Sequence, residues 1–188
     1  MKDAAGLSNI SVGITDGSGE GNIYVLDFDM KVNVVEKYNS TADFFTRVRV
    51  GSAGNAGLYQ QLTVNPEGKV VCQNNGVGQT VLGDTGEWIH VKMIYNVINP
   101  SNINLTDPSA STVEFYLVVV DAEGNEELVY NTSLYTSYVA NNKDVSKVFF
   151  TGREGNSDFD QQYFLDNITY VRTTDASVIP EIPAEPAE

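Results

Sequence analysis

The sequence predicts an all-β domain, an antiparallel sandwich of two sheets with very little helix. Apolar and polar residues alternate from Tyr24 to Val35, which is typical of a long strand with one buried face. Other short runs rich in Val, Ile, Thr and Tyr are separated by clusters of Gly, Pro and Asn, and no helical period of useful length occurs. A hydrophobic content of 41% in 188 residues supplies one continuous core, so we expect a single sandwich over residues 1–175.

The expected strands follow one another along the chain with hairpin turns between them. On the first long strand, Leu26, Phe28 and Met30 should face the core, and Asp27 and Asp29 should face away from it. Turn-forming residues at 65–68 and 122–125 mark two of the hairpins. The expected strands are residues 24–35, 42–51, 58–64, 69–73, 87–97, 112–121, 126–131, 147–151 and 161–173, with a weaker candidate at 9–14.

The charge and cysteine content exclude several classes of function. The chain has 11 basic and 25 acidic residues, a net charge of −14, which repels nucleic acid and anionic lipid surfaces. No apolar stretch is long enough to insert into a membrane. Cys72 is the single cysteine, so no internal disulfide can form, and its apolar neighbours indicate a small buried hydrophobe.

The C-terminal residues 176–188 alternate Pro with Ala, Ile and Glu, a composition typical of an extended, disordered linker that buries little surface. A linker of this kind indicates that the domain is joined to other domains of a parent polypeptide. We therefore expect a module of a larger secreted or cell-surface bacterial protein.

Three segments resemble the jelly-roll sandwiches of the concanavalin A-like lectin and glucanase (laminin-G-like) superfamily and the related carbohydrate-binding modules. They are VLDFDMKV at residues 25–32, GEWIHVK at 86–92 and YFLDNITYV at 163–171. The resemblance implies a jelly roll in which the last of these segments is the closing strand and returns beside the N-terminal strand. It also implies a lectin-like, extracellular function.

An enzymatic function is not expected. The glucanases that the chain resembles place carboxylates on one strand, and Asp27 and Asp29 have the spacing of such a pair. However, Val32 stands where a further acid belongs, and both acids are Asp where Glu is usual. His90 is the single histidine and has no nucleophile motif to serve as its partner.

The polar face of the expected sheet is a candidate carbohydrate site. Extending the alternation to neighbouring strands predicts a shared outward face that offers hydrogen bonds and one stacking ring to a sugar. Its members are Asp27, Asp29, Arg47, Arg49, Tyr59 and Gln61. Ordinary cross-strand ion pairs explain the same charges. Trp88, which shares a strand face with His90 and Lys92, is either a stacking platform at the rim or a cap on the core.

A structural calcium ion is expected near the closing strand. Asp166 is in phase with Phe164 and Tyr170 on a strand that should be buried, and a buried carboxylate needs compensation. In carbohydrate-binding jelly rolls that the chain resembles, such an aspartate holds calcium with an N-terminal segment, where Asp16 and Glu20 supply oxygens here. A backbone or arginine partner would satisfy Asp166 equally well.

The sequence thus favours a non-catalytic carbohydrate-binding or adhesion module that recognises a neutral polysaccharide or glycan. The alternative is a structural spacer or protein-interaction domain of a surface protein without a sugar site. A glycoside hydrolase is the third and weakest interpretation.

Overall fold

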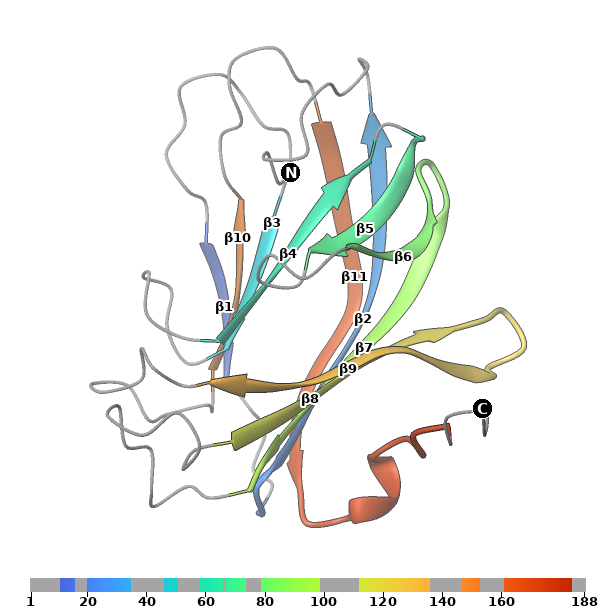
Figure 1. Cartoon of the computed structure of the whole chain (residues 1–188). Coiled ribbons are helices and arrows are strands. Elements are labelled where there is room, and N and C mark those ends of the chain that lie inside the picture. Colours follow the sequence, from blue (N-terminus) through green and yellow to red (C-terminus); the bar gives the residue numbers. More distant parts are fainter. Residues whose placement is uncertain are drawn as a thin grey trace.

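A computed structural model of the chain confirms an all-β, antiparallel two-sheet sandwich (Figure 1). The structure describes residues 11–15, 20–34, 46–50, 58–65, 67–73, 79–98, 112–135, 147–152 and 161–183. In these ranges the helical structure is a single 3₁₀ turn, η1 (Ala176–Val178). Among the same residues, no helix is long and apolar enough to cross a membrane.

One sheet has six strands in the order β1-β10-β3-β4-β5-β6, and the other has five in the order β11-β2-β7-β8-β9. The six-stranded sheet contains β1 (Ser11–Thr15), β10 (Lys147–Gly152), β3 (Thr46–Val50), β4 (Leu58–Val64), β5 (Lys69–Gln73) and β6 (Gln79–Asp84). The five-stranded sheet contains β11 (Gln161–Thr173), β2 (Ile23–Val34), β7 (Trp88–Val97), β8 (Thr112–Val120) and β9 (Glu126–Tyr135). Strand β6 was not among the expected strands.

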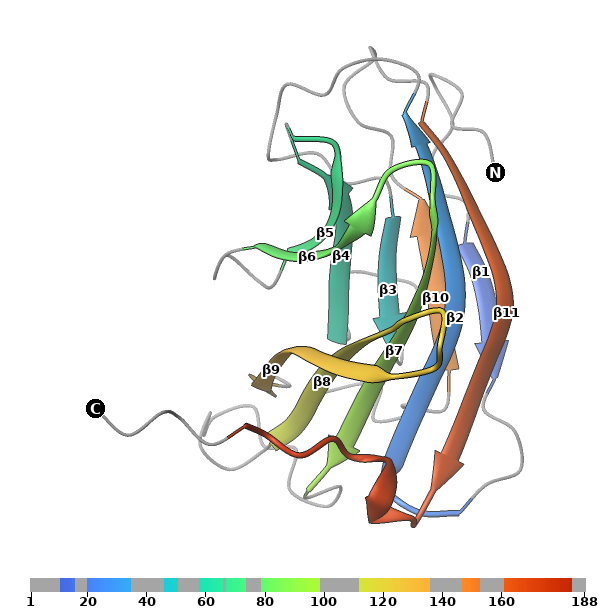
Figure 2. The same cartoon turned by 90° about the vertical axis from the view of Figure 1, so that its right-hand side faces the viewer.

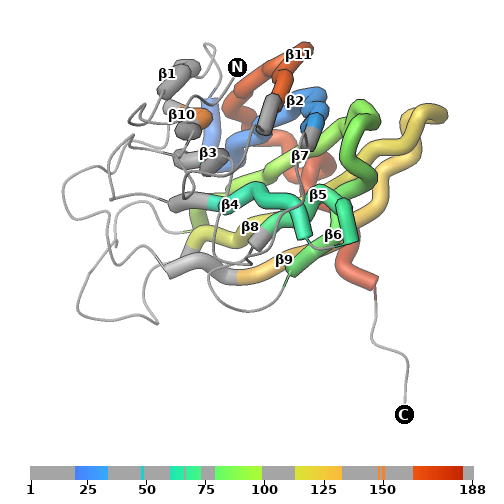
Figure 3. The backbone as a smooth tube through the Cα atoms, turned by 90° about the horizontal axis from the view of Figure 1, so that it is seen from above, coloured from blue at the N-terminus to red at the C-terminus, as the bar shows by residue number. Residues whose placement is uncertain are grey.

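Segments from the two halves of the chain lie side by side in both sheets, as Figure 2 shows for β2 and β11. β10 pairs antiparallel with β1, and β11 pairs antiparallel with β2 over nearly its whole length. Residues 163–171 therefore lie beside β2, the first long strand, whereas β1, the N-terminal strand of the described residues, pairs with β10. Seen from above, the strands of the two sheets form separate layers (Figure 3).

The core lies between the sheets and is built on the alternation of β2. Leu26, Phe28 and Met30 are fully buried, as the period of two predicts. The ring of Phe28 packs edge-on against Phe150 of the opposite sheet, with 5.1 Å between ring centroids. This contact ties the centre of β2 to β10 across the sandwich. Cys72 is also buried in this core, as expected.

A second, smaller cluster lies on the outer face of the five-stranded sheet, where Ile94 and Tyr116 are buried together with Ile23 and Val118. Val178 and Ile179 pack against this cluster from the segment that follows β11. The expectation that residues 176–188 bury little surface is therefore wrong for this part. Composition suggested a linker, but two apolar side chains are enough to dock η1 onto an apolar sheet face.

Replacing both docking side chains, Val178→Ala with Ile179→Ala, should destabilise the domain. The truncation removes half-buried apolar surface from the second cluster, which we expect to cost about 1.5 kcal/mol of unfolding free energy. In a domain of this size the melting temperature should fall by about 3–6 °C. Ile182→Ala is the matched control, because Ile182 is 57% exposed. Equal melting temperatures for the double variant and the wild type would show that the segment is not docked in solution.

Cys72 should be unreactive toward thiol reagents while the domain is folded. Burial raises the pKa of the thiol from 9.0 to about 12, so the nucleophilic thiolate is scarce near neutral pH. Ellman's reagent should detect no thiol in the native protein and one per chain in denaturant. Full reaction without denaturant would contradict the burial of Cys72.

Candidate functional site

The predicted outward face is divided between the two sheets. Arg47 pairs in register with Gln61, and Arg49 pairs with Tyr59, in the six-stranded sheet. Asp27 belongs to β2 in the five-stranded sheet, as does Asp29. The grouping of these six residues into one site is therefore wrong. It assumed that strands consecutive in sequence are neighbours in space, whereas the chain changes sheets between β2 and β3.

The true neighbours of β2 are β7 and β11, and they bring a different set of side chains to its polar face. The register places Lys92 opposite Asp27 and His90 opposite Asp29. Ile89, Val91 and Met93 are buried, so Trp88, His90 and Lys92 share the outer face, as expected. The partners of His90 lie on a neighbouring strand that is distant in sequence, so only the register reveals them.

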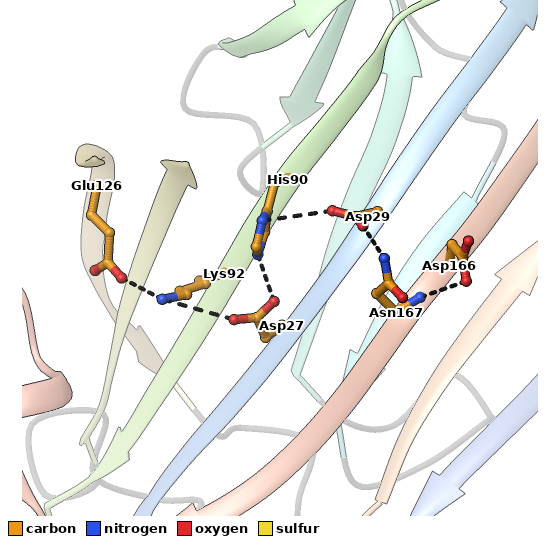
Figure 4. Close-up of polar contacts among 7 residues, drawn as sticks. All are labelled: Asp27, Asp29, His90, Lys92, Glu126, Asp166 and Asn167. Atoms are coloured by element: carbon orange, nitrogen blue, oxygen red, sulfur yellow. Dashed lines mark hydrogen bonds and ion pairs between the residues drawn. The ribbon is translucent and has the colours of Figure 1, made fainter. Parts of the chain in front are cut away.

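A continuous set of ionic and hydrogen-bonding side chains crosses the sheet from β9 to β11 (Figure 4). We call it the polar band. It consists of Glu126, Lys92, Asp27, His90, Asp29 and Asn167.

The histidine is the centre of the polar band. His90 Nε2 is 2.6 Å from Asp27 Oδ1, and His90 Nδ1 is 3.6 Å from Asp29 Oδ1. Lys92 Nζ forms an ion pair with Glu126 and lies 3.8 Å from Asp27 Oδ2.

The β11 end of the polar band is shaped by a β-bulge. The register between β11 and β2 shifts between Asp166 and Thr169, and Asn167 has a φ of 50°. Asn is among the few side chains that tolerate this left-handed conformation. The bulge directs the Asn167 side chain to β2, where its Nδ2 donates to Asp29 Oδ2 at 2.6 Å.

The bulge also explains why the burial of the closing strand was mispredicted. Before the bulge, Tyr163 faces the core, so Phe164 and Asp166 point outward. After the extra residue the phase changes, and Tyr170 is buried although it is in phase with Asp166 by simple alternation. The expectation that Asp166 is a buried carboxylate is therefore wrong: Asp166 is exposed, and its Oδ1 accepts a hydrogen bond from the Asn167 backbone N–H at 2.8 Å.

The expected calcium ligands do not come together. Glu20 precedes the end of β2 where Ile23 pairs with Thr173, whereas Asp166 is opposite Asp29, roughly 20 Å farther along the strand. Asp16 lies outside the described residues. Within the described part of the chain, no group of three or more His, Cys, Asp or Glu side chains is arranged to hold a metal. An ion shared by Glu20 and Asp166 does not fit this register, and calcium elsewhere stays a prediction.

Two exposed aromatic rings border the polar band. Trp88 and Phe164 are 52% and 40% exposed, and both are register partners of Lys31, which lies on the strand between them. Their backbones are therefore about 9.5 Å apart, two strand spacings. The turn before Trp88 is fixed because the Gly86 N–H donates to the Val32 carbonyl at 2.7 Å. Because about half of the Trp88 side chain is exposed, the interpretation that it caps the core is disfavoured.

The arrangement offers fixed hydrogen-bond donors and acceptors beside two flat apolar surfaces. Asp27 and Asp29 are each engaged by His90, and Asp29 also accepts from Asn167. Such groups are suited to orienting a polar ligand. A scan of protein-family models and a search of curated proteins each found no match to this chain.

The bulge predicts opposite roles for the backbone and the side chain of Asn167. Asn167→Ala loses the bond to Asp29 and places a β-carbon in a left-handed conformation, whereas Asn167→Gly loses only the bond. We expect the alanine variant to be about 1 kcal/mol less stable than the glycine variant by chemical denaturation. Equal stabilities would mean that β11 does not keep this bulge in solution.

Proposed function

We propose that this domain is a non-catalytic carbohydrate-binding module that holds a polysaccharide or glycan against the outer face of its five-stranded sheet. The observation that carries the proposal is the exposed pair Trp88 and Phe164 beside the polar band. This surface replaces the face around Tyr59, Arg47 and Gln61 that the sequence favoured.

The aromatic pair is suited to pyranose rings. A sugar ring has apolar C–H faces that stack on aromatic side chains, and its hydroxyl groups need polar partners around its edge. Trp88 and Phe164 supply the aromatic stacking surfaces. His90 and Asp29, in the next row of the sheet, supply the polar partners for the hydroxyl groups. The separation of the two aromatic residues favours a ligand of several linked rings over a single sugar.

The polar band is preorganised because its side chains are held by one another. Asp29 accepts from Asn167, and Asp27 is fixed between His90 and Lys92. A ligand that adds hydrogen bonds to such groups loses little side-chain entropy on binding. The same mutual pairing supports a non-catalytic role, since both aspartates are already bonded to side chains of the protein itself.

The alternative is a structural spacer or protein-interaction domain, and the mutual pairing in the polar band also favours it. Two exposed aromatic rings on one sheet face are the argument against a structural spacer, because a spacer gains nothing from exposing them. For either role we propose a place on a secreted or cell-surface bacterial protein.

Removing either ring should weaken binding to any polysaccharide that the wild type retains. A panel of plant, algal and host glycans first identifies a ligand by affinity electrophoresis. Trp88→Ala and Phe164→Ala should then each raise the dissociation constant about tenfold, or about 1.4 kcal/mol. Both residues are exposed, so the melting temperature should stay within about 2 °C.

The matched control is Val81→Ala, which removes a 50% exposed apolar side chain from β6 of the other sheet. It should leave affinity unchanged. The proposal fails if no glycan in the panel is retained, or if Trp88→Ala and Phe164→Ala bind as tightly as Val81→Ala does.

A further inference from the structure

The charge pattern beside the aromatic pair narrows the class of polysaccharide, on the assumption that the proposed function holds. Asp166 and Asp29 are direct register partners on neighbouring antiparallel strands. Side chains in such positions have β-carbons about 5 Å apart, and like charges there repel each other. Asp29 accepts a hydrogen bond from Asn167 and lies 3.6 Å from His90 Nδ1. In the described part of the chain no basic side chain forms an ion pair with Asp166.

We propose that the ligand is a polysaccharide with free amino groups, and that Asp166 and Asp29 together receive the ammonium group of an amino sugar. Asn167 donates to one oxygen of each carboxylate (Figure 4). An ammonium group that contacts the remaining oxygens offsets the repulsion between the carboxylates and gains charge-assisted hydrogen bonds. An ammonium group has three donors, enough to reach both carboxylates and a neighbouring hydroxyl oxygen.

The position of Asp166 relative to the rings fits this ligand. Asp166 is two residues from Phe164 on the same outward face, about 6.6 Å along β11. A sugar stacked on Phe164 therefore places a substituent of its own ring, or of the next ring, over the two carboxylates. The row that holds Asp166 also contains His90, so the amine lies at the β11 side of the polar band.

The negative charge of the surrounding surface also favours a polysaccharide with free amino groups. Around the aromatic pair the outer face presents the carboxylates of Asp27, Asp29, Glu126 and Asp166 and the ammonium groups of Lys31 and Lys92. Negative charge is therefore in excess on this face. The whole chain carries a net charge of −14. Both repel polyuronates and sulfated glycans and attract cationic chains over the Debye length.

The test compares two oligosaccharides with the same backbone. Glucosamine hexamers and their fully N-acetylated counterparts differ only in whether the nitrogen is charged, and binding is measured at about pH 6, where the free amine is protonated. The wild type should bind the amino form about tenfold more tightly at low salt. At about 1 M salt the two affinities should become nearly equal, because screening removes the ionic contribution to binding of the amino form.

Asp166→Asn is the diagnostic variant, since it removes the charge but keeps an Oδ1 acceptor for the Asn167 backbone N–H. It should reduce the preference for the amino form to about threefold or less. Glu67→Gln, at an exposed acidic residue in the turn between β4 and β5, is the matched control and should keep the full preference.

The outcomes separate this inference from the proposed function. Equal affinity for the two hexamers, with loss of both in Trp88→Ala, overturns the amine assignment and leaves the carbohydrate site standing. Retention of neither hexamer, when another glycan from the panel is bound, also overturns the amine assignment. Binding of poly-lysine as tightly as the amino hexamer, insensitive to Trp88→Ala, shows unspecific charge attraction and overturns it as well. If no glycan is retained, the proposed function itself fails.

Discussion

The pairing register of β2 is the constraint on which the rest of the structure depends. This strand contributes Leu26, Phe28 and Met30 to the core and Asp27 and Asp29 to the outer face, and it is hydrogen-bonded on both sides, to β7 and β11. A slip of one residue would exchange these two sets and bury the carboxylates. The edge-on packing of Phe28 against Phe150 opposes such a slip, because it fixes which residues of β2 reach the opposite sheet.

The sequence was informative about single strands and uninformative about which strands are neighbours. The alternation of β2 and of β7 predicted their buried faces correctly, since period two is a local property of the backbone. The proposed grouping of Asp27 with Arg47 failed because sheet membership depends on where the chain crosses the sandwich. No local pattern encodes that crossing. The partners of His90 could be recognised only once β2 and β7 were known to pair.

Two further features were missed for different physical reasons. The bulge at Asn167 changes the phase of β11, and an extra residue in a strand leaves no clear mark on hydrophobic alternation. The left-handed tolerance of Asn, placed where Leu165 breaks the alternation, was the one available signal. The docking of Val178 and Ile179 was hidden by their Pro-rich surroundings, and their apolar character became meaningful only beside the outer-face cluster that contains Ile94 and Tyr116. The chain thereby covers the apolar cluster around Ile94 and Tyr116 on its own outer face.

The bulge in β11 has a consequence for how separate molecules of this protein meet. β11 is an edge strand of the five-stranded sheet, and a long regular edge is a template on which another chain can add a strand. The extra residue at Asn167 interrupts the even spacing of backbone donors and acceptors along that edge and increases its twist. Asp166 is exposed, and an antiparallel pairing of two such edges centred on this residue would bring two like charges together. The irregularity that aims Asn167 at Asp29 therefore also guards the sheet against edge-to-edge aggregation.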